Sequence, residues 1–145
     1  MNLKKVIQEI ENAASNQSQI QKIVIDENAI QELENDASSK YPMFGIEIMN
    51  TDLQLSDTNE SAVYYLNLFS LDSELQGKQN RVDCLSDTLG ILHDVFAELK
   101  RNGYYEYKTN GQATIITEVA PSHTAGWIMP IQVIGAYTSN TCDIP

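Results

Sequence analysis

Hydrophobic residues at the start of the chain recur with the spacing of an amphipathic helix. They fall at positions i, i+3, i+4 and i+7, which share one side of a helix; they are Leu3, Val6, Ile7, Ile10, Ala13 and Ala14. The pattern predicts an N-terminal helix over residues 2–15, within a segment 1–16 that Asn16 closes. An apolar run at 23–25 predicts a short strand, and the acidic, polar residues 26–40 predict an exposed connection.

The next apolar residues alternate with polar ones, as they do in a half-buried strand. Tyr41-Pro42 precedes this stretch, and proline is tolerated at the first residue of a strand. The alternating residues are Phe44, Ile46 and Ile48. Leu53 and Leu55 either extend the strand or belong to the turn that follows. Residues 62–71 are apolar on both faces, which predicts a strand in the centre of a sheet.

The strongest helical pattern lies over residues 82–101. Its predicted apolar stripe consists of Val82, Leu85, Leu89, Leu92, Val95, Phe96 and Leu99. Asn80 is placed to cap the start, with Asp83 three residues later as a variant capping box, and Asn102-Gly103 supplies the end. At about 100° per residue, an acidic stripe falls opposite the apolar one and faces solvent or a lumen; it consists of Asp83, Asp87, Asp94 and Glu98.

The last third of the chain has a strand pattern. Asn110-Gly111 is typical of a hairpin turn, and residues 113–120 and 127–137 predict two strands. Pro130 interrupts the second of these, which favours an edge or a bulge there. The order of elements predicts one α+β domain over residues 1–145, in which a mostly antiparallel sheet carries one long helix packed across it and an N-terminal helix.

Composition excludes several classes of protein. The 145 residues carry 20 acidic and 9 basic side chains, a net charge of −11, so binding to nucleic acid through charge is not expected. No apolar run is long enough to span a membrane, and the polar start is unlike a signal peptide. Two cysteines, Cys84 and Cys142, form no disulfide framework and fit a reducing cytoplasm.

No residue pattern indicates catalysis or a cofactor. Cys84 and His93 are nine residues apart on one predicted helix and point to opposite faces, so they do not share a metal. His123 beside Ser122 lacks the context of a nucleophile and base, and no phosphate-binding glycine loop is present. The acidic stripe offers solvated carboxylates, which make poor general acids, although it could meet basic groups of a neighbouring subunit. We therefore expect no enzyme, no cofactor and no metal.

The final 22 residues end in an unusually apolar way for a chain terminus. This end either packs on its own domain or docks on a neighbouring subunit, with Cys142 a small buried hydrophobe. The candidate subunit-interface residues are Trp127, Tyr137, Cys142, Asp143, Ile144 and Pro145.

Several short motifs together resemble a known family. They are Ile23-Val24-Ile25, Tyr41-Pro42, Leu71-Asp72, Val82-Asp83, Ala125-Gly126-Trp127 and the terminal Cys142-Asp143-Ile144-Pro145. Over roughly residues 20–145 the chain is similar to small virion proteins of tailed phages of Bacteroidetes hosts, including crAss-like phages. It departs from closer relatives in residues 26–40, which lack their Gly-Asp turn.

The resemblance implies a fold like that of tail-terminator and tail-completion proteins, and a structural role without chemistry. It implies a homo-oligomeric ring, of six or twelve copies, in the neck or tail of the virion (a head–tail connector or tail terminator). Other neck and tail proteins would be its partners, the ring would be assembled in the host cytoplasm, and DNA would pass through it without sequence-specific binding. The alternative function is a soluble acidic protein-binding module or inhibitor with no virion role.

Overall fold

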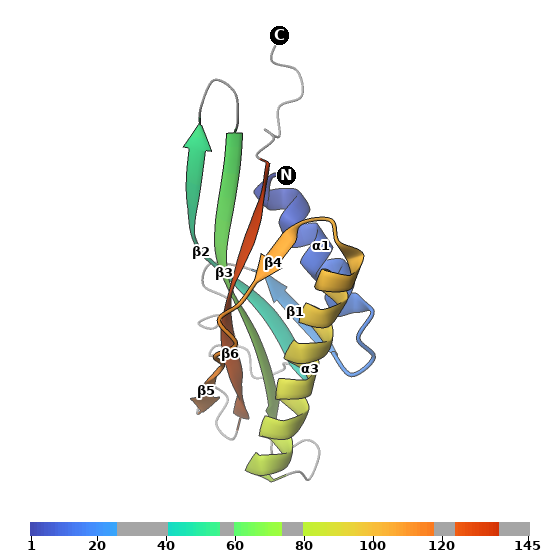
Figure 1. The fold of residues 1–145 in the computed structure, drawn as a ribbon. Helices are drawn as coiled ribbons and strands as arrows, with labels where there is room; N and C mark the ends of the chain where they lie inside the picture. Colours follow the sequence, from blue (N-terminus) through green and yellow to red (C-terminus); the bar gives the residue numbers. More distant parts are fainter. Residues whose placement is uncertain (26–40, 56–59, 74–79, 118–123, 137–145) are drawn as a thin grey trace.

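The computed structural model describes residues 1–25, 41–55, 60–73, 80–117 and 124–136, and it has an α+β fold (Figure 1). Two helices lie on one side of a six-stranded sheet. The predicted fold class is confirmed. The elements in chain order are α1 (Leu3–Ser15), β1 (Lys22–Ile25), β2 (Met43–Leu55), β3 (Glu60–Ser73), α3 (Arg81–Asn102), β4 (Glu106–Lys108), β5 (Thr114–Thr117) and β6 (Thr124–Ala136).

The sheet has the order β1-β2-β3-β6-β4, and β5 also pairs with β6. β1 runs parallel to β2, while every other pair is antiparallel. β3 lies between β2 and β6 over its whole length, so the prediction of a central strand at 62–71 is confirmed. The connection predicted at 26–40 and the turn after Leu55 lie outside the described residues.

The main core lies between the helices and the sheet. Alternate residues of β2, β3 and β6 meet the buried side of both helices, because successive side chains of a strand point to opposite faces. This cluster includes Phe44, Ile46, Leu66, Leu68, Val133, Ile10 and Val95. A smaller cluster on the other face consists of Val24, Met43, Phe69 and Leu71. Apolar residues on both faces of β3 explain its central place in the sheet.

Both helices begin at an asparagine cap. The Asn2 side chain accepts a hydrogen bond from the Lys5 backbone N–H, and the Asn80 side chain accepts one from the Asp83 N–H at 2.9 Å. α3 ends at Gly103, whose φ of 67° belongs to the left-handed region that glycine tolerates. The predicted bounds of both helices are therefore right to within one residue.

The buried stripe of α3 differs from the predicted one. Val82 and Leu89 are 72% and 44% exposed, whereas Cys84, Thr88 and Ile91 are buried. The helix is rotated so that its small residues face the sheet near its start. The hydroxyl of Thr88 is satisfied there by donating to the Cys84 carbonyl at 2.7 Å, which removes the cost of burying it. Hydrophobicity alone therefore misplaced the first half of the stripe.

The predicted hairpin at Asn110-Gly111 is wrong. β4 and β5 do not pair with each other; both pair with the same edge of β6, so the chain continues in one direction across the turn. The interruption falls opposite Pro130, which cannot donate to a ladder, and there the Thr109 hydroxyl donates to the Pro130 carbonyl at 3.0 Å. Pro130 thus splits the ladder on one side of β6, although β6 itself is an interior strand.

β2 is longer than the part that its outer neighbour covers. β1 pairs with Met43–Ile46 alone, and β2 continues to Leu55 with a bulge between Ile48 and Asn50. No strand in the described part of the chain pairs with its outer edge beyond Ile46. The paired ends of β2 and β3 reach beyond the helices at the top of Figure 1. We call residues 47–55 the arm.

Candidate interaction surfaces

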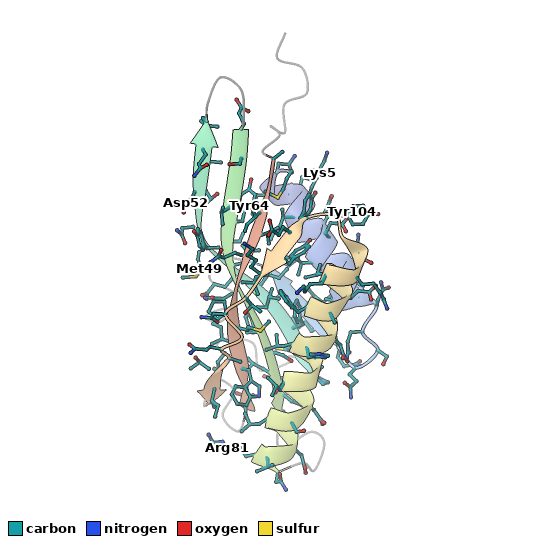
Figure 2. The ribbon with its side chains drawn as sticks, in the orientation of Figure 1. Lys5, Met49, Asp52, Tyr64, Arg81 and Tyr104 are labelled. Carbon is teal, nitrogen blue, oxygen red and sulfur yellow. The ribbon has the colours of Figure 1, made fainter. Side chains whose placement is uncertain are left out.

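The large hydrophobic side chains that are exposed in the described residues gather at the two opposite edges of the sheet. The first group lies on the arm and consists of Met49, Leu53 and Leu55. The second group consists of Val82 and Leu89 on α3, Tyr104 between α3 and β4, and Ile115 on β5. Figure 2 shows Met49 of the first group and Tyr104 of the second on opposite sides of the molecule. Exposed apolar residues that cluster in this way mark interaction surfaces.

The arm pairs with β3 along one of its two edges. Its Asp52 accepts a hydrogen bond from the Tyr65 hydroxyl at 2.9 Å, and Glu47 accepts one from the Asn67 amide at 3.0 Å. The hydrogen bond to Asp52 raises the pKa of Tyr65. These bonds lie on the face away from the helices. Leu53 pairs in register with Ala62 of the main core, so Leu53 projects on the helix side.

The second group forms what we call the receiving edge. It consists of Val82 and Leu89 on the outer flank of α3, Tyr104 after the end of α3, and Ile115 on β5, which pairs with the far side of β6. Val82 and Leu89 are one heptad apart, so they lie on one flank of α3. Ile115 is the register partner of Trp127, whose indole N–H bonds to α3, so Ile115 also projects on the helix side. Within the described residues, the receiving edge therefore combines a helix flank with a strand edge that no further strand pairs with.

The arm is acidic, whereas the receiving edge carries charges of both signs. The described residues from 47 to 60 include Glu47, Asp52 and Glu60 and no lysine or arginine. The receiving edge carries Lys100 beside Phe96, with Nζ 5.9 Å from the ring centroid. Lys108 lies on β4 and pairs with Glu106 at 3.3 Å, and Arg81 begins α3. In a chain of net charge −11, these cations are a local feature of this edge, although Glu106 balances Lys108.

Trp127 is the one predicted interface residue that falls in the described ranges. It is partly buried in β6, and its Nε1 donates a hydrogen bond of 2.7 Å to the Leu85 carbonyl of α3. The indole therefore joins the helix to the sheet within one chain. The other candidates, Tyr137, Cys142, Asp143, Ile144 and Pro145, lie outside the described residues.

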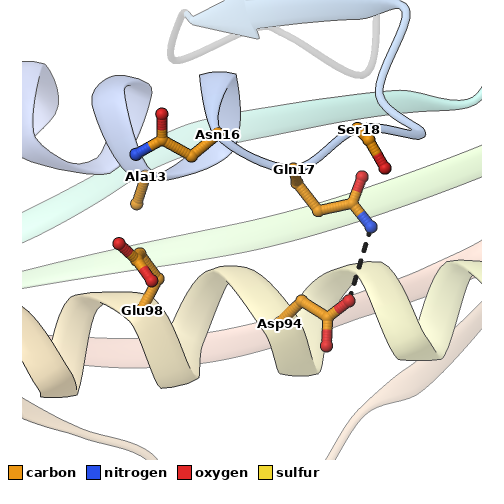
Figure 3. Close-up of a pocket in the computed structure, with 6 residues that line it drawn as sticks. All are labelled: Ala13, Asn16, Gln17, Ser18, Asp94 and Glu98. Atoms are coloured by element: carbon orange, nitrogen blue, oxygen red, sulfur yellow. Dashed lines mark hydrogen bonds between the residues drawn. The ribbon is translucent and has the colours of Figure 1, made fainter.

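The predicted acidic stripe lies on the flank of α3 that faces α1, not directly opposite the buried face. Asp94 and Glu98 line a hollow of about 240 Å³ with Ala13, Asn16, Gln17 and Ser18 (Figure 3). Gln17 donates to Asp94 at 3.4 Å, His93 lies 3.5 Å from Asp94, and Arg101 pairs with Glu98. These carboxylates therefore have local partners. Because α3 is rotated, they flank the core rather than oppose it.

The other two members of the stripe lie near the start of α3. Asp83 is exposed in the first turn, where a carboxylate interacts favourably with the helix dipole. Asp87 is partly buried and lies near Asp72 of β3. Burial raises the pKa of Asp72, the Asp87 charge raises it further, and a hydrogen bond from the Ser73 N–H at 2.8 Å opposes this shift. The charge of Asp72 therefore costs stability at neutral pH.

A second hollow, of about 250 Å³, lies between the β2 bulge and the segment after β4. Six of the residues that line it are Met49, Asn50, Tyr65, Asn67, Lys108 and Asn110. Its lining joins the base of the arm to the end of β4, so a partner that contacts the arm from this face would also reach β4.

The described residues contain no group of three or more His, Cys, Asp or Glu side chains that could hold a metal ion. Cys84 is buried and His93 exposed on opposite sides of α3, as predicted, and His123 lies outside the described ranges. Burial, with smaller contributions from Glu9 and Tyr105, raises the pKa of Tyr107, so its phenol stays protonated. None of the described helices is long and apolar enough to cross a membrane.

The sequence contains signals for both exposed surfaces, but the residues that carry them were assigned to the core stripe of the predicted helix and to a predicted strand or turn. Val82 and Leu89 were assigned to the core because they continue the apolar stripe of a helix that is amphipathic over most of its length. Leu53 and Leu55 continue the alternation of β2 beyond the residues that the core requires. The sequence pattern that marks the arm is therefore a strand whose alternating apolar residues continue beyond those that pack in the core.

Comparison of the chain with models of known protein families and with curated protein sequences finds no match.

Proposed function

We propose that this protein is a structural subunit of a ring in the neck or tail of a phage virion, a head–tail connector or tail terminator. One observation supports ring formation above the others: two different exposed apolar surfaces lie at opposite edges of one sheet. A contact between two different surfaces is head-to-tail. Repetition of such a contact produces a closed ring when the rotation between copies closes.

The placement in a virion is supported by the sequence motifs that resemble small proteins of tailed phages. The net charge of −11 is compatible with this role, because an acidic wall repels the phosphate backbone and lets DNA slide.

Light scattering coupled to size-exclusion chromatography, together with electron microscopy of the purified protein, tests the ring. We expect a single assembly with the mass of a small integral number of copies and a central opening. Imaging or mass spectrometry of the phage particles tests the virion role, and the protein should be present in stoichiometric amounts. A strict monomer that is absent from virions would overturn the proposal, and a single stoichiometric host partner would favour a binding module.

A further inference from the structure

We propose that the hollow between the β2 bulge and the segment after β4, on the face of the sheet away from the helices, binds a neutral sugar residue of a glycan. The hollow is built by a single chain, so this site goes beyond the proposed ring and does not depend on it. Its hydrogen-bonding groups, its apolar side chains, its charge and its size each point to this class of ligand.

A row of polar side chains crosses four neighbouring strands at the hollow. Asn50 on β2 is the register partner of Tyr65 on β3. Gln132 on β6 pairs with Tyr65 on one side and with Lys108 of β4 on the other. Tyr65 alternates with Leu66 of the main core, so the row projects on the face away from the helices. Adjacent strands lie about 4.8 Å apart, so one ring-shaped ligand can contact two or three of these side chains.

The hydrogen-bonding groups of the hollow match hydroxyl groups. Among the described residues, the side-chain amides of Asn50 and Gln132 have no hydrogen-bond partner. Each amide has two N–H donors and a carbonyl acceptor, and a sugar hydroxyl both donates and accepts. Asn67 donates its N–H to Glu47 at 3.0 Å and keeps its carbonyl oxygen as an acceptor. A ligand with several hydroxyls on one ring therefore satisfies this set, whereas a group that only donates or only accepts satisfies half of it.

Apolar side chains complete the hollow. Met49, at the bulge of β2, lines it on one side, Pro130 of β6 lines it on the other, and Tyr65 comes from the strand between them. The Tyr65 hydroxyl donates to Asp52 at 2.9 Å, which fixes the orientation of its ring. The C–H groups of a sugar ring can pack on such side chains, and ligand sites generally combine apolar residues with a few placed polar groups.

The charges around the hollow favour a neutral ligand. Three carboxylates project on the same face beside it, those of Glu47, Asp52 and Glu106. The ammonium group of Lys108 lines the hollow and already pairs with Glu106 at 3.3 Å. The carboxylates repel phosphate and carboxylate ligands, and Lys108 repels a free cation. A sugar without charge avoids both costs.

The size of the hollow suits one sugar ring, and its backbone excludes a peptide strand. Its volume of about 250 Å³ is below the ~300–1,000 Å³ of pockets that hold drug-sized ligands. β3 and β6 pair with a strand on both sides at this level, so their backbones offer nothing to an extended peptide, and recognition depends on side chains. A site of this size should bind a single sugar residue weakly, with a Kd on the order of 1–10 mM.

Saturation-transfer difference NMR on the purified full chain tests the site, because this method detects weak ligands on a monomer or on a large assembly. The neutral probes are the methyl glycosides of glucose, galactose, mannose and N-acetylglucosamine. Glucuronic and galacturonic acid are the anionic probes, and adenosine is a flat, neutral one. The tightest glycoside should bind with a Kd on the order of 1–10 mM, and both acids should bind at least about fivefold more weakly than it.

Gln132→Ala and Gln54→Ala form a matched pair of variants. The first removes an amide that lines the hollow, and the second removes the same group from the same face of the sheet, outside the hollow. Gln132→Ala should weaken the binding of the tightest glycoside about 2- to 10-fold, and adding Asn50→Ala should bring the loss to at least about fourfold. Gln54→Ala should bind like the wild type. All three side chains are exposed, so circular dichroism and the melting temperature should show folded proteins.

Four outcomes overturn the proposal. A Kd above about 50 mM for all four glycosides shows that the hollow does not bind a sugar. An equal loss of affinity in Gln54→Ala and Gln132→Ala places the binding elsewhere. An acid that binds as tightly as the best glycoside contradicts the role of the carboxylates, and adenosine bound more tightly than every glycoside assigns the hollow to a flat heterocycle. None of these outcomes changes the expectation for the ring, which light scattering measures separately.

Discussion

Trp127 links β6 to α3 through a side-chain hydrogen bond, and replacing it with phenylalanine measures what this link contributes to stability. The change removes one hydrogen bond, of 2.7 Å, from the indole N–H to the Leu85 carbonyl. The Leu85 carbonyl lies inside α3 and keeps its helical hydrogen bond from the Leu89 N–H, so no buried acceptor is left unpaired. The loss is then the net value of one hydrogen bond, about 0.5–1.5 kcal/mol.

The smaller phenyl ring also gives up contact area. A few tens of Å² of apolar surface at about 25 cal/mol per Å² adds roughly 0.5 kcal/mol, because the side chain is only partly buried. The two terms predict a decrease of about 1–2 kcal/mol in the free energy of unfolding. In a domain of this size, that decrease lowers the melting temperature by about 3–7 °C.

Urea unfolding followed by circular dichroism measures this decrease, since the change removes the one tryptophan and with it the fluorescence signal. Tyr104→Phe is the control, because the Tyr104 side chain is exposed and the loss of its hydroxyl should change stability by less than about 0.5 kcal/mol. A Trp127→Phe protein as stable as the wild type would refute the role of this hydrogen bond. A change in the m-value would show instead that unfolding is no longer two-state.

Three further changes test other parts of the fold. Gly126→Ala should destabilise the protein by more than about 3 kcal/mol or prevent folding, because a Cβ there would lie 1.8 Å from the Ser70 backbone oxygen. In Gly90→Ala, by contrast, the added Cβ meets nothing within 4 Å, so this change should stabilise α3 by up to about 1 kcal/mol in thermal melts. Asp72→Asn should raise the melting temperature at pH 7: the raised pKa of the carboxyl means that its charge costs stability there. That gain should shrink as the pH falls through the raised pKa and vanish below about pH 4, and a gain that is constant with pH would contradict it. Asn80→Ala should cost about 1 kcal/mol in urea unfolding through loss of the cap, with Asn80→Ser as the variant that retains it.

The sequence by itself determined the elements whose signals are local. The spacing of Val6 and Ile10 defined α1, and the caps Asn80 and Gly103 defined α3 to within a residue. The apolar residues on both faces of 62–71 predicted a central strand, and β3 does pair on both of its edges, although its face away from the helices is buried only at Phe69 and Leu71. Such features depend on the backbone and on neighbours within one or two turns.

Only the tertiary structure decided the features that depend on which surfaces meet. The rotation of α3 was set by packing against β3 and β6, where the small Cys84 and Thr88 fit close to the sheet, so the more hydrophobic Val82 and Leu89 were left on the outer flank. The turn at Asn110 did not reverse the chain, because β6 offered an unpaired edge on both sides of Pro130. Likewise, the arm is visible as an interaction surface only once β1 is seen to stop at Ile46. Hydrophobic pattern gives the tendency of a residue to be buried, whereas the partner that buries it comes from residues distant in sequence.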